Sequence, residues 1–450
     1  MTKTQPAGGL ILSESRPLRL FTLFILYVTQ GVPIGLFWFA IPAWMAANGS
    51  AAEDVAYVLG FTALPWTLKL VNGFVMDRYT FLKMGRRRVW IIGAQLVMIA
   101  CLIACALINP SSSDVVLLAA AGFIVNSATT FQDVAVDGLA VDIMEEDERA
   151  RGSGMMFGGQ AIGSAIATAA TGTVISIWGS GAAYLLSAVF IGVITIYMGA
   201  LRERGGESRL PWTSGNAHPV NLAVQADAWW PILKATTISL FTPVSLFWMI
   251  NLLGRGFHYG VFTGTTPLIG TGSTGWDEAQ ITSLIGTGGL IGGIAGLTIG
   301  GFFGDRMGAK WSTAAMLLIF AVIDLTMFFG TELWGDEQFY IGFVIGWLVC
   351  DTLITVVALP ISMRLCDPKV AATQFTIYMA TANFGISMGA WALGFTDAIG
   401  GLANFFLVVL AFHAVSFAIV VLVKFPRSKA RQAKATAVLA SANGPAPVID

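Results

Sequence analysis

The sequence predicts an all-α membrane protein with twelve transmembrane helices. The 450-residue chain is 56% hydrophobic and 11% charged, whereas soluble domains carry roughly 25% charged residues. The mean hydropathy is +0.74, and the formal net charge of −1 gives no reason to expect a nucleic-acid partner. Twelve apolar runs reach about the 20 residues that a helix needs to cross a bilayer. They are residues 20–46, 55–76, 89–109, 115–144, 152–178, 182–201, 237–268, 279–304, 311–331, 338–363, 371–396 and 400–423.

Lysine and arginine lie on only one side of these runs. Of the 25 basic residues, 23 fall in the N-terminal arm, every second connection and the C-terminal tail. The alternate connections contain nine acidic residues and no basic ones. Because basic loops remain in the cytoplasm, the pattern predicts a multi-pass protein of the inner (cytoplasmic) membrane with both termini in the cytoplasm. The other two cations, Lys69 and Arg255, lie inside apolar runs, where a charge is a candidate functional group.

One long connection divides the chain into two halves. We expect a cytoplasmic arm at 1–19, a six-helix bundle at 20–201, a cytoplasmic linker at 202–236, a second six-helix bundle at 237–423 and a cytoplasmic tail at 424–450. The halves repeat one another, because Asp77-Arg78 follows the second run and Asp305-Arg306 follows the eighth. Two bundles related by pseudo-twofold symmetry are typical of transporters that alternate access around a central site.

The turn after the second run is similar to the loop motif of the major facilitator superfamily, G-x-x-x-D-R-x-G-R-R. Here GFVMDR at 73–78 is followed, after six more residues, by GRRR at 85–88. This longer form resembles the AmpG muropeptide permease and acetyl-CoA transporter family, as do YVTQGVPIG at 27–35, LPWTLKL at 64–70 and QDVAVDG at 132–138. The resemblance implies the major facilitator fold, with runs one, four, seven and ten around a central cavity. It also implies an amphiphilic, anionic solute such as a muropeptide; a siderophore or acyl-CoA-type permease is the alternative within the family.

Run four carries Asp133 and Asp137, which are four residues apart and share one face of a helix. Lys69 lies 8 residues before Asp77, and Asp137 lies 8 residues before Glu145; both landmarks mark the cytoplasmic end of a run. At about 1.5 Å per residue, Lys69 and Asp137 are expected at one depth, with Asp133 a turn deeper. We predict that Asp133, Asp137 and Lys69 couple transport to protons. The alternative is a permanent salt bridge between runs two and four.

Run seven carries Asn251, Arg255 and His258 at spacings of four and three, which places them on one helical stripe. The fork of an arginine suits a carboxylate or a phosphate, and Asp351 in run ten is a candidate partner. The resemblance places these side chains and Gln30 at the cavity. We therefore predict that Gln30, Asn251, Arg255, His258 and Asp351 bind the solute. The alternatives are an Arg255–Asp351 pair that only fixes the helices and a histidine that only packs.

The loop motif predicts a gate on the cytoplasmic side. An aspartate at the end of run two can cap the positive N-terminus of a neighbouring helix, and the arginines can pair with the acids at 145–148. The alternative is that the basic residues set topology alone. The predicted gate residues are Asp77, Arg78, Arg86, Arg87, Arg88, Asp305 and Arg306.

Several classes of protein are not expected. The chain has no G-x-x-x-x-G-K-[ST] loop for a nucleotide and no group of cysteine, histidine and acid at metal-binding spacing. We therefore predict no enzyme, cofactor or metal site. Run five lacks the glycine-proline signature of drug antiporters, which favours uptake. The prediction is a proton-coupled importer that acts as a monomer in the bilayer, with protons and a small solute as partners. A non-transporting membrane assembly factor is the alternative from another class.

Overall fold

The computed structural model describes residues 10–50, 52–225, 228–276 and 278–425. Most of the predicted tail at 424–450 therefore lies outside the described residues, as do the first nine residues of the predicted arm. The first half contains α1 (Arg16–Ile34), α2 (Ile41–Ala47), α3 (Ala52–Leu68), α4 (Leu70–Arg78), α5 (Arg88–Ile108), α6 (Val115–Ile143), α7 (Arg149–Trp178) and α8 (Ser180–Ala200). The connection contains α9 (Pro219–Val224) and α10 (Trp229–Leu240). The second half contains α11 (Pro243–Ile269), α12 (Glu278–Ala295), α13 (Gly301–Phe329), α14 (Glu337–Leu365), α15 (Ala371–Ala392) and α16 (Asn404–Leu422).

These helices account for the predicted apolar runs. Among the described residues, nine helices are long and apolar enough to cross a membrane. Two bent pairs, α3 with α4 and α10 with α11, raise that number to eleven. The remaining predicted run, 371–396, is occupied by α15, which packs against α11 and α4. Runs eight and nine are separated by a break at Gly308, whose φ of 73° is readily adopted only by glycine. The prediction of an all-α membrane fold is confirmed.

The two halves pack their helices in the same way. In the first half α1 packs against α7, α3 against α6, and α5 against α8. The corresponding pairs in the second half are α11 with α15, α12 with α14, and α13 with α16. Glycines permit the closest of these approaches: Gly163 of α7 lies against the backbone of Val28, and Gly389 of α15 lies against the backbone of Phe257. The repeat seen in the sequence is thus a repeat of tertiary contacts.

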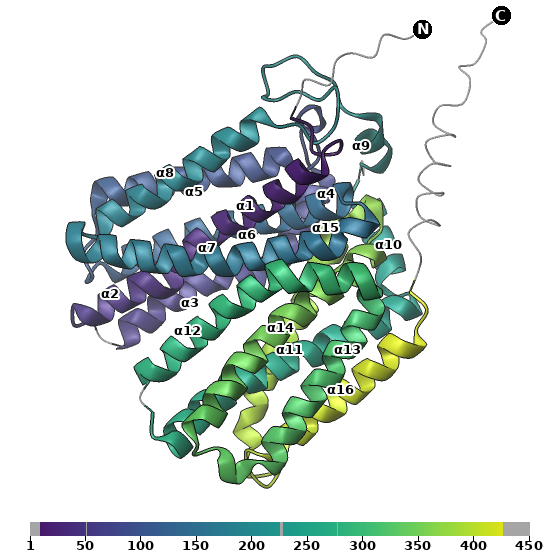
Figure 1. Cartoon of the computed structure of the whole chain (residues 1–450). Helices are drawn as coiled ribbons and strands as arrows, with labels where there is room; N and C mark the ends of the chain where they lie inside the picture. The colour runs from purple at the N-terminus through teal and green to yellow at the C-terminus, as the bar shows by residue number, and fades with distance from the viewer. Residues whose placement is uncertain (1–9, 51, 226–227, 277, 426–450) are drawn as a thin grey trace, which may run out of the picture.

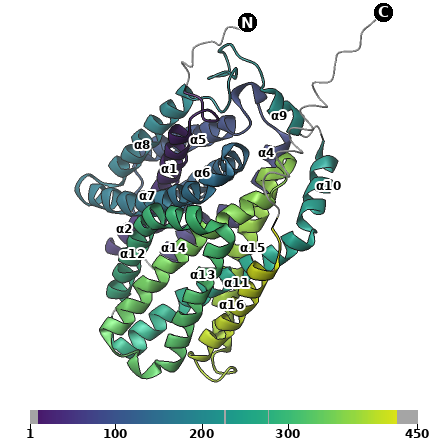
Figure 2. The ribbon, with the colours of Figure 1, turned by 45° about the vertical axis from the view of Figure 1, so that its right-hand side comes forward.

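The halves meet through α7, which packs on α12, α13 and α14, and through α4, which packs on α15. In Figure 1 the first half, purple to blue, lies above the green and yellow second half, and the described ends of the chain lie on the same side as α9 and α10. Figure 2 shows α10 standing beside the second half rather than within it. The loops rich in arginine lie at this end of the bundle, which we call the arginine-rich side.

Candidate functional site

A buried ionic cluster joins three spans of the first half. Lys69 lies at the junction of α3 and α4, where the span bends by 40°. Pro65 precedes the bend, and a proline removes a backbone hydrogen bond from the helix. Lys69 Nζ donates to Asp133 Oδ2 at 3.0 Å, and Gln30 Nε2 donates to Asp133 Oδ1 at 2.7 Å. Both oxygens of this carboxylate therefore have a donor, one of them cationic.

The second carboxylate of the cluster has a neutral partner. Asp137 accepts a hydrogen bond of 2.5 Å from the hydroxyl of Tyr27 and is only 4% exposed. Since Lys69 is bonded to Asp133, these two groups compensate each other. A buried carboxylate without a cation is costly, so a proton on Asp137 would bring the cluster of Lys69, Asp133 and Asp137 to net neutrality. The arrangement can hold and release one proton.

The sequence predicted the members of this cluster but not all of its contacts. We expected Lys69 level with Asp137, whereas the hydrogen bond of Lys69 goes to Asp133. The bend at Lys69 breaks the straight-helix geometry on which that depth estimate depended. Tyr27 was not among the predicted site residues. Its position three residues before Gln30, on the same face of α1, was the available signal.

The second half has an ion pair at the corresponding spans. Arg255 Nε of α11 lies 3.8 Å from Asp351 Oδ1 of α14, and their side chains keep 22% and 15% of their surface exposed. Asn251 lies one turn earlier on α11, is buried, and has an amide nitrogen without a hydrogen-bond partner among the described residues. Because the two groups are 3.8 Å apart and their side chains are partly exposed, an anion can compete with Asp351 for the guanidinium of Arg255.

His258 lies apart from this pair. It is 3% exposed and receives a hydrogen bond of 2.8 Å from the indole of Trp347. Its Nε2 also lies 3.4 Å from Asp324, which contacts His413. Asp324 and His413 were not among the predicted site residues, and no metal-type cluster was expected from the sequence. They lie in α13 and α16, remote from His258 along the chain. Their polarity inside apolar runs was the signal that could have marked them.

On the arginine-rich side, Asp77 connects the two halves. This fully buried aspartate ends α4 and accepts from the backbone N–H and the hydroxyl of Thr373, both at 2.9 Å. Thr373 is in the first turn of α15, where an anion is favoured by the helix dipole. Arg86 and Arg87 donate to the other carboxylate oxygen at 3.1 and 2.9 Å. Arg86 also donates to the backbone carbonyls of Pro368 and Lys369, so Asp77 and Arg86 both join the first half to the second on this side.

The third arginine of the loop has a different environment. The backbone N–H groups of Arg86, Arg87 and Arg88 all donate to the carboxylate of Glu203, at 2.6 to 2.8 Å. The guanidinium of Arg88 donates to backbone carbonyls, including those of Met198 and Arg209. Gly85 has a φ of 98°, and a Cβ there would collide with the carboxylate of Glu203. The glycine of the motif is therefore required by the backbone turn around Glu203. Glu203 itself was not among the predicted gate residues.

Two other parts of the predicted gate differ from expectation. The acids at 145–148 do not pair with the loop arginines: Arg364 binds Glu146 at 2.7 Å, and Arg19 binds Glu148. Arg78 lies over the ring of Tyr79, whereas Arg86 and Arg87 pair with Asp77 and Asp142. In the second copy of the motif, Arg306 is exposed and lies over Phe302. The side chain of Asp305 lies outside the described part of the structure.

Glu207, in the loop beyond α8, should make stability depend on pH. Burial and the neighbouring Glu203 carboxylate raise the pKa of Glu207 to about 7, whereas an unfolded glutamate has a pKa of about 4.3. The folded protein thus retains a proton that the unfolded chain loses, and stability falls as the pH rises from about 4.5 to 7. We expect Glu207→Gln to unfold at a higher temperature than wild type at pH 7.5 and to show a smaller difference at pH 5. An equal difference at both values would contradict this assignment.

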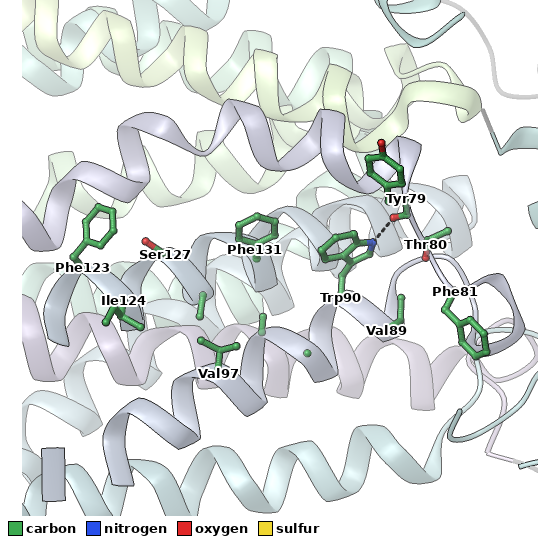
Figure 3. Close-up of a pocket in the computed structure, with 13 residues that line it drawn as sticks. Tyr79, Thr80, Phe81, Val89, Trp90, Val97, Phe123, Ile124, Ser127 and Phe131 are labelled. Atoms are coloured by element: carbon green, nitrogen blue, oxygen red, sulfur yellow. Dashed lines mark hydrogen bonds between the residues drawn. The ribbon is translucent and has the colours of Figure 1, made fainter. Parts of the chain in front are cut away.

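An apolar pocket of about 670 Å³ lies elsewhere, against α5, α6 and the turn after α4 (Figure 3). Trp90 donates to the carbonyl of Tyr79 at 2.9 Å and stacks on Phe131. None of the described side chains that line the pocket is charged. Val97 and Ile124 on its wall are about half exposed, so it opens outward from the bundle. We do not place the solute there.

Two similar helical halves, with an ionic group between the helices of each, define a multi-pass membrane transporter. The chain belongs to the major facilitator superfamily: a sequence profile described as Major Facilitator Superfamily matches residues 23–296. The chain is 24% identical over 406 residues to the anhydromuropeptide permease of Escherichia coli K12, covering 86% of this chain and 76% of that protein. It is 23% identical over 388 residues to the folate-biopterin transporter of Synechocystis, covering 83% and 73%.

Solved structures share the fold. The major facilitator transporter FucP in the outward conformation aligns with a TM-score of 0.66 at 13% identity, covering 91% of this chain and 99% of that chain. The proton:xylose symporter XylE aligns with a TM-score of 0.62 at 9% identity, covering 90% and 95%. The predicted family and fold are confirmed, and the relatives are permeases rather than enzymes.

Proposed function

We propose that the protein is a proton-coupled secondary transporter that imports an amphiphilic, anionic solute by alternating access. The observation that carries the proposal is the buried cluster of Lys69, Asp133 and Asp137, which holds one carboxylate more than it has cations. Burial of that unpaired charge is costly, and a proton compensates it. The likeness to an anhydromuropeptide permease supports a muropeptide as solute. We place the arginine-rich side in the cytoplasm of an inner-membrane protein, following the positive-inside rule.

The contacts on the arginine-rich side support an outward-facing state. Asp77 binds the start of α15 and Arg86 binds the turn before it, so the cytoplasmic ends of the halves are joined. Glycines lie where α7 crosses the second half: Gly158 is packed against Leu297 and Gly293 against Ala161. Small residues allow packed helices to approach closely. Release of the Asp77 contacts would let the halves rock about this crossing.

Asp77→Asn should therefore favour the inward-facing state. The substitution removes the charge that binds α15, Arg86 and Arg87; hydrogen bonds to charged groups are worth about 1.5–3 kcal/mol. We expect the inward-facing population to rise by on the order of tenfold or more. Spin labels at the exposed positions Lys83 and Met307, on opposite halves, would report a longer distance. Glu332→Gln on the opposite side is the matched control, and an unchanged distance distribution in Asp77→Asn would refute the gate assignment.

Arg255 should make the binding affinity depend on the negative charge of the solute. Arg255→Lys keeps the charge but loses the two-pronged donor geometry, so we expect weaker binding of an anionic muropeptide. Amidation of the solute's carboxylates should then cost affinity in wild type and much less in Arg255→Gln. Asp351→Asn, which frees the guanidinium, should tighten anion binding. Equal losses on amidation in wild type and Arg255→Gln would leave Arg255 as a structural partner of Asp351.

The test of the proposed function is uptake by the purified protein in proteoliposomes. With an inward proton gradient, labelled anhydromuropeptide should accumulate, and a protonophore should abolish accumulation. A thermal-shift screen with muropeptides, siderophores and acyl-CoA compares the solute classes, because a bound ligand stabilises the folded protein by RT ln(1 + [L]/Kd). Stabilisation by a siderophore or acyl-CoA alone would favour the alternative permeases. Absence of flux for every solute class would favour a non-transporting assembly factor.

A further inference from the structure

A second group of titratable residues is buried in the second half, separate from the ion pair of Arg255 and Asp351. His258 of α11, Asp324 of α13 and His413 of α16 place their ligand atoms within 4.8 Å of one another, and each residue is at most 3% exposed. The rings of Phe320 and Trp347 pack around His258 at 4.8 and 5.0 Å. Water therefore does not compensate the carboxylate of Asp324, and the imidazoles must.

Two buried acceptors of the cluster have no partner among the described residues, Asp324 Oδ1 and His413 Nε2, and the first of them lies near a ring nitrogen of His258. Nδ1 of His413 lies 2.7 Å from Asp324 Oδ2. Asp324 Oδ1 has no hydrogen-bond partner in the described structure, although His258 Nε2 is only 3.4 Å away. The reason is Trp347, whose indole N–H can only donate and lies 2.8 Å from the same His258 nitrogen. His258 Nε2 is therefore an acceptor in this state, and its proton is on Nδ1.

We propose that His258, Asp324 and His413 form a proton-binding site that is distinct from the cluster in the first half. With both imidazoles neutral, the group carries one uncompensated negative charge, and one added proton makes it neutral. The added proton binds His258 Nε2 rather than the unpartnered His413 Nε2, because His258 Nε2 lies 3.4 Å from Asp324 Oδ1 and can then donate to that open acceptor. The hydrogen bond from Trp347 to His258 is lost in the same step, because a protonated nitrogen has no lone pair to offer.

Proton binding at this site is linked to the predicted solute site through two helices. Arg255 lies three residues before His258 on α11, and Asp351 lies four residues after Trp347 on α14. The bond between Trp347 and His258 joins these helices within about one turn of the ion pair. The groups that face Asp324 are His258 from α11 and His413 from α16; Trp347 from α14 donates without titrating, and Arg255 and Asp351 pair with each other. Protonation thus loosens α14 from α11 next to the Arg255–Asp351 pair.

The same geometry argues against a metal ion as the occupant. Histidine binds a metal through a ring-nitrogen lone pair, and in His258 the lone pair of Nε2 faces the N–H of Trp347. A cation at this nitrogen would meet a donor hydrogen instead of an acceptor. The use of the site in transport rests on the proposed proton coupling, but the existence of the site does not.

The chain has only three histidines, which permits a direct test. Protein labelled with ¹⁵N-histidine in lipid nanodiscs is titrated from pH 5 to 9 without solute or gradient, and His218→Gln assigns the signal of the linker histidine. We expect His258 to be the Nδ1–H tautomer at high pH and to gain a proton on Nε2 as the pH falls, with His413 responding in the same step. In Asp324→Asn, His258 and His413 should no longer titrate together between pH 5 and 9.

A matched pair of tryptophan variants tests whether the hydrogen bond from Trp347 controls the protonation of His258. Trp347→Phe removes the donor that favours neutral His258, and since one such hydrogen bond is worth about 0.5–1.5 kcal/mol, the titration midpoint should rise by about half to one pH unit. Trp248→Phe is the control, because its indole joins the same helices through Ser362 at 2.8 Å but contacts no histidine. It should leave the midpoint unchanged.

Three results would overturn the proposal. They are wild-type His258 and His413 signals that stay constant from pH 5 to 9, equal midpoints in the two tryptophan variants, and stoichiometric Zn²⁺ binding to metal-free protein that His413→Gln abolishes. The last would assign a metal site instead. A wild-type protein whose histidines titrate but which shows no proton-driven uptake would retain this site and reject the proposed function, so the two failures are distinguishable.

Discussion

Asp137→Asn should abolish proton-driven accumulation of solute while retaining exchange of solute across the membrane. The amide is close in shape to the carboxyl group and can still accept from Tyr27, but it cannot take up or release a proton. Exchange of labelled for unlabelled solute requires no net proton movement, so the transporter should still carry solute in both directions. Accumulation should fall by on the order of a hundredfold or more, within the range seen when a group that must transfer a proton is removed.

Uptake and counterflow in the same proteoliposomes measure this difference. Asp133→Asn is the informative comparison, because Asp133 is bonded to Lys69 and its loss should also impair folding. Tyr27→Phe removes the hydrogen bond to Asp137 but leaves the carboxyl group, so it should shift the pH dependence of uptake without abolishing it. Normal accumulation in Asp137→Asn would show that protons couple elsewhere.

Lys69→Ala should unfold far more readily than Lys69→Ala combined with Asp133→Asn. The single substitution leaves Asp133 as a buried carboxylate whose remaining donor is Gln30, and breaking a buried pair costs about 3–5 kcal/mol. The double substitution removes both charges, so much of that loss should be recovered. The measurement is the thermal unfolding midpoint in detergent for the two single variants and the double variant.

The choice of partner is testable in the same series. Lys69→Ala with Asp137→Asn should remain nearly as unstable as Lys69→Ala alone, since Asp137 is bonded to Tyr27. If adding Asp137→Asn to Lys69→Ala restored the unfolding midpoint and adding Asp133→Asn did not, the ammonium of Lys69 would pair with Asp137 instead. Neither double variant is expected to transport against a gradient, so stability is the readout that separates them.

The apolar runs and the arginine-rich side followed from the sequence because these properties depend on local composition. A run of some twenty apolar residues can span a bilayer only as a helix, and each loop carries its own charge. The identities of Lys69, Asp133, Asp137, Arg255 and Asp351 as candidate site residues followed from the same reasoning, since a charge within an apolar run is costly wherever its helix is placed.

The partners of those residues were decided by the tertiary structure. Lys69 binds Asp133 rather than Asp137 because its span bends there, and helix bends and rotations are set by packing against neighbouring helices. Tyr27 and Asp137 are 110 positions apart, and His258 and Asp324 meet only because α11, α13 and α16 share one interior. Glu203 reaches the arginine loop across a similar separation. Local sequence determines that a buried polar group needs a partner; only the packing of the helices determines which group provides it.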